Sequence, residues 1–245
     1  MRTGILIIGS LLWDNGHRGA WRESRLCVQD KVYVKAPIRY GRRSTSRGNT
    51  FTMTFGIDDT LGQAVLVPCV TGVGEVAGLV AEAEALWKAE EPFAAANSIG
   101  GPWGCVGVVF RTENTQADWL ATWRNHFRSK ASAIPPVDDQ GILRIPWPVT
   151  TAEGRPAEVG AVLATATKAE AKRPTATEIA DAWIDQRYGH ERYFFENVRH
   201  GIRTAEDGLI WRRIEERAPC WLRSGEHAEA VELLRAKAAG RLTSP

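Results

Sequence analysis

The apolar residues of this chain follow two patterns, which predict strands in some segments and helices in others. Short apolar or alternating runs bounded by glycine, proline and polar residues are typical of strands. Such runs occupy residues 4–8, 31–40, 51–57, 63–69, 104–110 and 159–166. Apolar residues repeat at helical spacing in 75–90 and 114–129 instead. Strands and helices therefore mix without a regular order, and the pattern predicts an α+β fold.

From residue 131 onward, the sequence predicts a long connection followed by helices. Residues 131–156 are rich in proline and polar side chains, which predicts a long connection. After Pro174 the apolar spacing is helical, and Thr175 with Glu178 has the pattern of a capping box. The sequence therefore predicts a helical C-terminal part that begins near Thr175.

The first strand is predicted to open onto a loop with unpaired main-chain groups. Residues 5–8 are four consecutive aliphatics, and Gly9-Ser10 interrupts the run before Leu11-Leu12. A loop that leaves a buried strand presents main-chain N–H groups, which can hold an oxyanion such as a carboxylate. The alternative is a buried first strand followed by an ordinary turn.

A glutamate lies on the apolar face of the helix predicted at 75–90. The apolar stripe of that helix extends to Glu90, and Pro92 disfavours helical geometry at Glu91, so the helix is expected to end near Glu90. Burial and the negative end of the helix dipole both raise the pKa of a carboxylate there, which suits it to exchange a proton near neutral pH. The alternative is a glutamate at the rim that pairs with an arginine.

Composition narrows the classes of protein to consider. The 245 residues carry a formal net charge of +2, with 44% hydrophobic and 24% charged residues, unlike the strongly basic domains that bind nucleic acid. No apolar stretch approaches the length of a membrane span. The four cysteines lie far apart without a CxxC pair, and no secretory leader is recognised, so a cytoplasmic location is expected.

The histidines, cysteines and glycine-rich segments do not form a recognisable metal, cofactor or nucleophile motif. The five histidines are scattered without the spacing of a metal site, and no GxGxxG or Walker pattern follows a predicted strand, so no metal or organic cofactor is expected. Cys105 and His126 are candidates for a nucleophile and its base. Cys105, however, opens an apolar run in which a buried and inert thiol is expected.

The loop after the first strand resembles the Tyr-Gly-Ser-Leu signature that opens the γ-glutamylcyclotransferase-like proteins, including their ChaC-type branch. The matching residues are Gly9, Ser10, Leu11 and Trp13. Ile8 stands where the family has tyrosine. The resemblance implies that the main chain of this loop holds the γ-glutamyl group of a substrate. The implied binding residues are Ile8, Gly9, Ser10, Leu11 and Leu12.

The end of the helix at 75–90 resembles a second motif of the same family. Leu86-Trp87-Lys88-Ala89-Glu90 is similar in spacing to the Leu-Asp-x-x-Glu stretch that ends at the family's catalytic glutamate, with Trp87 in place of aspartate. The resemblance implies that Glu90 is catalytic, while Glu91 stays an alternative for that role.

Two further segments are similar to the ChaC-type branch. Residues 42–50 resemble its arginine-rich strand and His-Arg-Gly-Thr loop, with Ser46 in place of histidine, which makes Arg47 a weaker candidate for holding the substrate carboxylate. Residues 178–197 resemble its C-terminal Gln-Ile-Ala and Gly-x-Asn-x-Glu-Tyr-Leu helices. The segments occur in the order that the family has.

The resemblance implies a fold and an activity. The expected fold is a small mixed β-barrel over residues 1–170, with an insertion expected at 114–154, and a helical extension at 171–245 packed on it. The expected activity is release of 5-oxoproline from a small γ-glutamyl compound such as glutathione, with Glu90 as proton carrier. The alternatives are a non-catalytic module that binds a small ligand on the same fold, and an adaptor built from the C-terminal helices.

Overall fold

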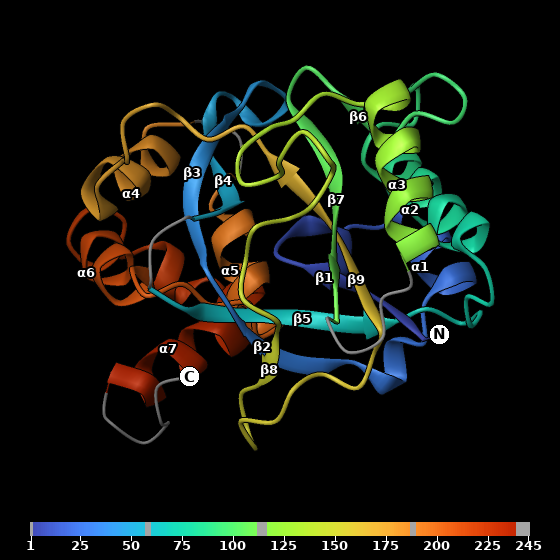
Figure 1. The fold of residues 1–245 in the computed structure, drawn as a ribbon. Coiled ribbons are helices and arrows are strands. Elements are labelled where there is room, and N and C mark those ends of the chain that lie inside the picture. The colour runs from blue at the N-terminus through green and yellow to red at the C-terminus, as the bar shows by residue number, and fades with distance from the viewer. Residues whose placement is uncertain (1, 57–59, 112–116, 187–189, 239–245) are drawn as a thin grey trace.

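A seven-stranded sheet with the strand order β6-β7-β9-β1-β5-β2-β8 forms the centre of the molecule, as Figure 1 shows. The computed structural model describes residues 2–56, 60–111, 117–186 and 190–238. The strands of this sheet are β1 (Thr3–Ile7), β2 (Val32–Ala36), β5 (Gly62–Pro68), β6 (Gly100–Gly101), β7 (Gly104–Phe110), β8 (Val149–Thr150) and β9 (Ala161–Thr167). A separate two-stranded sheet pairs β3 (Ile38–Ser44) with β4 (Thr50–Phe55).

Strand β1 lies in the middle of the large sheet because its aliphatic side chains are covered on both faces. All five of its residues are buried. It runs antiparallel to β5 and parallel to β9, so that Ile5 lies opposite Val67 on one side and Leu163 on the other. The strand predicted at 4–8 is confirmed with a shift of one residue, and the loop that follows it leaves from the centre of the molecule.

The strand predicted at 31–40 is divided in two at Pro37. Residues before Pro37 form β2 in the large sheet, and residues after it form β3 in the small sheet. Proline has no N–H to donate to a strand ladder, and its main chain is restricted, so the chain can change sheets at this position. This division places Arg42 and Arg47 at the cavity beside the end of β1.

The mixed α+β class is confirmed, but the strands do not close into the predicted barrel within the part of the chain described. The large sheet ends at β6 and β8, which are two residues each. The hairpin β3–β4 approaches β9 through side chains instead of a strand ladder: the Thr54 hydroxyl donates to the Thr167 carbonyl at 2.9 Å, and the Thr167 hydroxyl donates to the Met53 carbonyl at 3.4 Å. These two threonines take the place of main-chain pairing at that corner.

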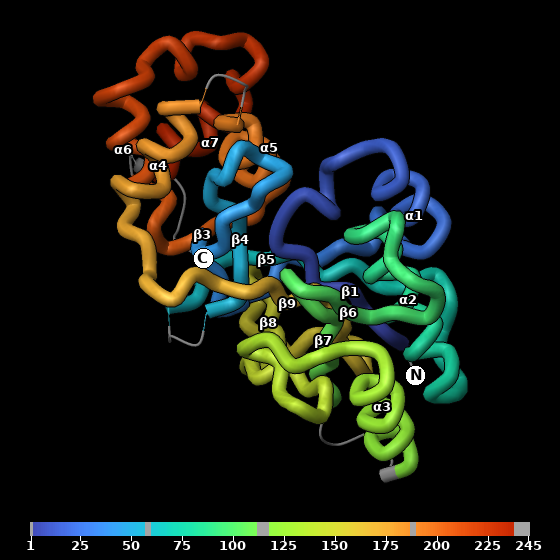
Figure 2. Tube along the Cα trace, turned by 90° about the horizontal axis from the view of Figure 1, so that it is seen from above, coloured from blue at the N-terminus to red at the C-terminus, as the bar shows by residue number. Residues whose placement is uncertain are grey.

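The helices lie in two groups on either side of the sheets. They are α1 (His17–Arg25), α2 (Val76–Glu90), α3 (Ala117–Lys130), α4 (Ala176–Ile184), α5 (Arg192–Arg199), α6 (Asp207–Arg217) and α7 (Ala228–Ala238). Figure 2 shows α1, α2 and α3 on one side, and α4 to α7 gathered beside the β3–β4 hairpin on the other. No described helix has both the length and the apolar character needed to cross a bilayer.

Helix α2 ends where the sequence predicts, and the cause is local. Glu91, which precedes Pro92, has left the helical conformation, with φ −131° and ψ 85°, and a proline disfavours helical geometry in the residue before it. Its N–H donates to the carbonyl of Trp87 at 2.8 Å and closes the last turn. The buried face of α2 includes Leu79 and Leu86. Glu90 is therefore the last helical residue, at the edge of that buried face.

The C-terminal helices contact the hairpin closely. The capping box predicted at the start of α4 is present: Thr175 accepts from the Glu178 N–H at 3.2 Å, and Glu178 accepts from the Thr175 N–H at 2.7 Å. Farther along α4, the indole of Trp183 donates to the carbonyl of Phe51 in β4 at 3.1 Å. The proposed boundary near residue 170 stays a prediction.

Candidate functional site

A cavity of about 580 Å³ lies at the end of β1. Its walls come from the loop after β1, the end of α2, Arg42, residues 44–47, β4, the end of β9 and Tyr193 of α5. The structure brings six of the seven predicted site residues to this cavity: Ile8, Gly9, Ser10, Leu11, Arg47 and Glu90. Leu12 does not line it, because its side chain is buried in the core.

The loop after β1 forms a single tight turn that leaves part of its main chain free. The Leu12 N–H donates to the Gly9 carbonyl at 3.0 Å, and the Trp13 N–H donates to the Ser10 carbonyl at 3.2 Å. The structure shows no acceptor, among the residues it describes, for the N–H groups of Gly9, Ser10 and Leu11. Unpaired N–H groups beside a cavity suit an anionic group of a ligand.

Gly9 is required by the close approach of Tyr193. A Cβ atom at Gly9 would lie 2.6 Å from the Tyr193 hydroxyl oxygen. That oxygen accepts a hydrogen bond from the Met53 N–H at 3.2 Å, so it is held between β4 and the loop. The backbone of Gly9 is extended, with φ −174°, which other residues also adopt. The need for glycine is therefore steric.

Replacing Gly9 with alanine is expected to destabilise the fold by about 1–3 kcal/mol, the usual cost of overpacking. The partner variant Tyr193→Phe removes the oxygen that the new methyl group meets. Urea unfolding of the two single variants and the double variant measures their coupling. We expect the double variant to be more stable than the sum of the single effects predicts. Strict additivity would contradict the steric assignment.

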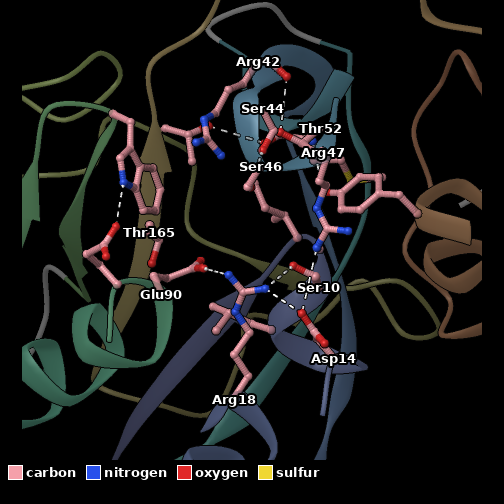
Figure 3. Close-up of a pocket in the computed structure, with 18 of the residues that line it drawn as sticks. Ser10, Asp14, Arg18, Arg42, Ser44, Ser46, Arg47, Thr52, Glu90 and Thr165 are labelled. Carbon is pink, nitrogen blue, oxygen red and sulfur yellow. Dashed lines mark hydrogen bonds and ion pairs between the residues drawn. The ribbon is translucent and has the colours of Figure 1, made fainter. Parts of the chain in front are cut away.

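Glu90 extends from the end of α2 into the cavity toward Arg18 of α1 (Figure 3). Its Oε2 atom lies 3.2 Å from a terminal nitrogen of Arg18, and only 15% of its side chain is exposed. Burial raises the pKa of Glu90, and the positive charge of Arg18 is the strongest opposing influence. The raised pKa agrees with the expectation from its place on the helix.

Arg18 connects three parts of the site. One of its nitrogens lies 2.7 Å from Oδ2 of Asp14 and 3.1 Å from Oγ of Ser10, while its Nε donates to the carbonyl of Ala89 at 3.4 Å. The Ala89 carbonyl is one of the last in α2, and cations near such carbonyls are stabilising. Arg18 thus joins the loop, its own helix and the helix end that carries Glu90.

The facing wall carries the remaining charged groups. The guanidinium of Arg42 lies over the ring of Trp103 at 4.4 Å, and the Trp103 indole donates to Glu91 at 3.3 Å. Arg47 lies over the ring of Tyr193 at 5.0 Å and reaches Oδ2 of Asp14 at 3.9 Å. The cavity therefore combines three arginines with three carboxylates, and Glu91 is already engaged by an indole.

The alternative nucleophile Cys105 and its candidate base His126 lie outside this cavity. Cys105 is fully buried in β7, and burial raises the pKa of its thiol to about 11. His126 faces Glu84 at 3.4 Å. Neither residue lines the cavity at β1. Among the residues that the structure describes, no group of three or more histidine, cysteine or acidic side chains is arranged to hold a metal ion.

Several residues of the cavity were not predicted as site residues. Asp14 and Arg18 follow the loop at the i, i+4 spacing of a helical ion pair, which was the available signal. Tyr193 lies in an apolar helical stripe, where its ring is expected in a core. Trp103 follows the glycines of a predicted loop, and its place against Arg42 depends on how β6 and β7 turn.

Comparisons with protein-family models, with curated proteins and with solved structures find no match to this chain.

Proposed function

We propose that this chain is a γ-glutamylcyclotransferase-like enzyme, on a divergent form of that fold, that releases 5-oxoproline from a γ-glutamyl compound. The observation that carries the proposal is that the carboxylate of Glu90 and the loop of residues 8–11 line one cavity. The two motifs that resemble the family, the loop at Ser10 and the stretch that ends at Glu90, are far apart in the sequence, and both line this cavity.

The proposed reaction is intramolecular and its atoms balance without a redox step. The α-amine of the substrate attacks its own γ-carbonyl, a new C–N bond closes the five-membered ring, and the original amide C–N bond breaks. The attacking nitrogen loses two protons between the α-ammonium and the ring N–H, and the departing nitrogen gains two and leaves in its protonated form; Glu90 carries protons from the first nitrogen to the second. The products are 5-oxoproline and a free amine. Most of the rate gain comes from holding the substrate in the ring-closing geometry.

The residues of the cavity have complementary roles in this proposal. The free N–H groups of the loop bind carboxylate oxygen, with Arg47 as an additional cation on the far wall. Burial raises the pKa of Glu90, which brings it closer to the neutral range in which a general base and acid is most effective. The small-molecule substrate is a γ-glutamyl compound, and glutathione is the first to test.

A second candidate is a non-catalytic module that binds a small ligand in the same cavity. The ion pair between Glu90 and Arg18 at 3.2 Å favours this alternative, because a carboxylate held by an arginine is a weaker base. In that case the cavity holds a zwitterionic ligand by its charges alone, and no bond is broken.

One assay separates the two candidates. The purified protein is incubated with glutathione, γ-glutamylglycine and γ-glutamylmethylamide, and 5-oxoproline is measured by chromatography against a protein-free control. Cyclotransfer predicts stoichiometric release of 5-oxoproline and the matching amine. Saturable binding by calorimetry without any 5-oxoproline supports the binding module and contradicts the proposed enzyme.

A further inference from the structure

The three arginines of the cavity differ in the partners they already have. Arg18 lies 2.7 Å from Asp14 and 3.2 Å from Glu90, and Arg47 lies 3.9 Å from Asp14. Arg42 forms no ion pair with any residue that the structure describes; its contact is the Trp103 ring at 4.4 Å. Arg42 is therefore the cavity arginine that has no carboxylate within ion-pair distance among the described residues, although the charge of Glu90 acts on it from farther away.

A half-buried arginine without a counter-ion is costly to the fold and marks a site for an anion. Removing a guanidinium from water costs free energy that an ion pair normally offsets. Burial lowers the pKa of Arg42, and the charge of Glu90 is the strongest influence that opposes this shift. The Trp103 ring covers one face of the guanidinium, whereas the N–H groups along its edge are the ones that bind a carboxylate in bidentate fashion.

We propose that Arg42 binds the α-carboxylate of the γ-glutamyl group and so fixes which atom Glu90 can deprotonate. This inference rests on the proposed function. The α-ammonium and the α-carboxylate are attached to the same carbon, so the cation that binds the carboxylate must lie beside the base that takes the proton. Arg42 on β3 and Glu90 at the end of α2 line the same cavity and interact electrostatically.

The other cations of the cavity are less suited to this role. Arg18 already bonds to the loop, to Asp14 and to Glu90, so a substrate would have to displace a carboxylate of the protein. Arg47 packs over the Tyr193 ring and is directed at Asp14. The loop N–H groups complement Arg42, because a carboxylate has two oxygens and accepts from both a cation and main-chain donors.

The test compares compounds whose only carboxylate is the α-carboxylate with one that has a second carboxylate. For γ-glutamylmethylamide, Arg42→Gln is expected to raise KM about 10- to 100-fold with a smaller change in kcat, the effect of losing one charge-assisted contact. Arg42→Lys, which keeps the charge, is expected to recover part of the loss. The matched control is Arg43→Gln. Arg43 follows Arg42 in β3 and stacks on Phe51 of the neighbouring strand β4 at 4.2 Å, but it lies outside the cavity, so the KM of this variant should equal that of wild type.

A binding measurement keeps the inference separate from the proposed function. L-Glutamine, which has a neutral γ-amide, is titrated into wild type and into Arg42→Gln by calorimetry. If L-glutamine binds in an Arg42-dependent way and none of the γ-glutamyl compounds releases 5-oxoproline, the carboxylate site is supported and the proposed enzymatic activity is overturned. Turnover with an unchanged KM in Arg42→Gln keeps the enzyme and overturns the role of Arg42. A KM effect confined to γ-glutamylglycine, which has a second carboxylate, overturns the assignment to the α-carboxylate.

Discussion

Replacing Glu90 with glutamine is expected to lower the rate of 5-oxoproline release by about 10²-fold or more, the usual range for loss of a general acid–base. Glutamine keeps the shape and the hydrogen-bonding reach of the side chain but cannot carry the proton. The loop of residues 8–11 and Arg42 are untouched by the change, so KM should stay near the wild-type value. Initial rates of 5-oxoproline formation over a range of substrate concentrations give both constants.

The neighbouring glutamate is the matched control for that experiment. Glu91 lines the same cavity, but its carboxylate accepts a hydrogen bond from the Trp103 indole at 3.3 Å, and its main chain has left the helix. Glu91→Gln keeps an acceptor for that indole and should have a mild effect. Loss of turnover in Glu91→Gln with near-normal turnover in Glu90→Gln would assign the proton to the other residue. Full activity of both variants would remove the proposed mechanism.

The pH dependence of stability is expected to follow the buried carboxyl of Asp207. This residue begins α6, is 1% exposed, and accepts from the Thr204 hydroxyl at 2.5 Å. Burial raises the pKa of Asp207 from 3.8 to about 6, with the Thr204 hydrogen bond and the charge of Arg203 as opposing influences. Between pH 3.8 and about pH 6, the Asp207 carboxyl is therefore protonated in more of the folded molecules than of the unfolded chains.

The raised pKa of Asp207 makes the folded state less stable as the pH rises. Between about pH 4 and pH 6 the folded state binds more protons at Asp207, so its contribution to stability falls as the pH rises and is fully lost above pH 6. A shift of this size corresponds to about 3 kcal/mol. Asp207→Asn, which is neutral at every pH, is expected to be more stable than wild type by about 2–3 kcal/mol at pH 7.5 and nearly equal to it at pH 4.

Urea unfolding at pH 4 and pH 7.5 tests this prediction through the difference between variant and wild type, in which the other carboxyl groups cancel. Asp185→Asn is the control, because the Asp185 side chain is 61% exposed at the end of α4 and faces Arg217. Its difference from wild type should depend little on pH. An Asp207→Asn variant that is less stable than wild type at pH 7.5 would show that the carboxyl is charged and favourably placed in the folded state.

The parts of the site that could be predicted from sequence are those set by neighbouring residues. Pro92 acts on Glu91, one position away, and so the end of α2 and the place of Glu90 follow from local geometry. The aliphatic run before Gly9 needs burial on both faces, which places the strand in the middle of the sheet and begins the loop at the end of that strand. Both features depend on residues that are neighbours in the sequence, so they can be predicted without knowing how the distant elements pack.

The parts that could not be predicted depend on how distant elements pack. Arg18 reaches Glu90 across 72 positions, and this contact requires that α1 and α2 lie side by side. The division of the strand at Pro37 was available as a local signal, yet the sheet that β3 then joins is decided by its pairing with β4. The place of Tyr193 depends on a contact with Met53 across 140 positions. Periodicity gives the face of such a residue and not its partner.

The contact of Tyr193 with Met53 can form only after α5 has been synthesised. The ribosome releases the loop at Gly9 and the helix that carries Glu90 long before it reaches Tyr193 in α5, whose hydroxyl abuts Gly9 and bonds to Met53. Long-range contacts of this kind form late, since the chain between them must first be complete. A nascent chain that ends before α5 therefore carries the acid–base residue but lacks one wall of its cavity. The protein therefore completes this cavity only after α5 has been synthesised.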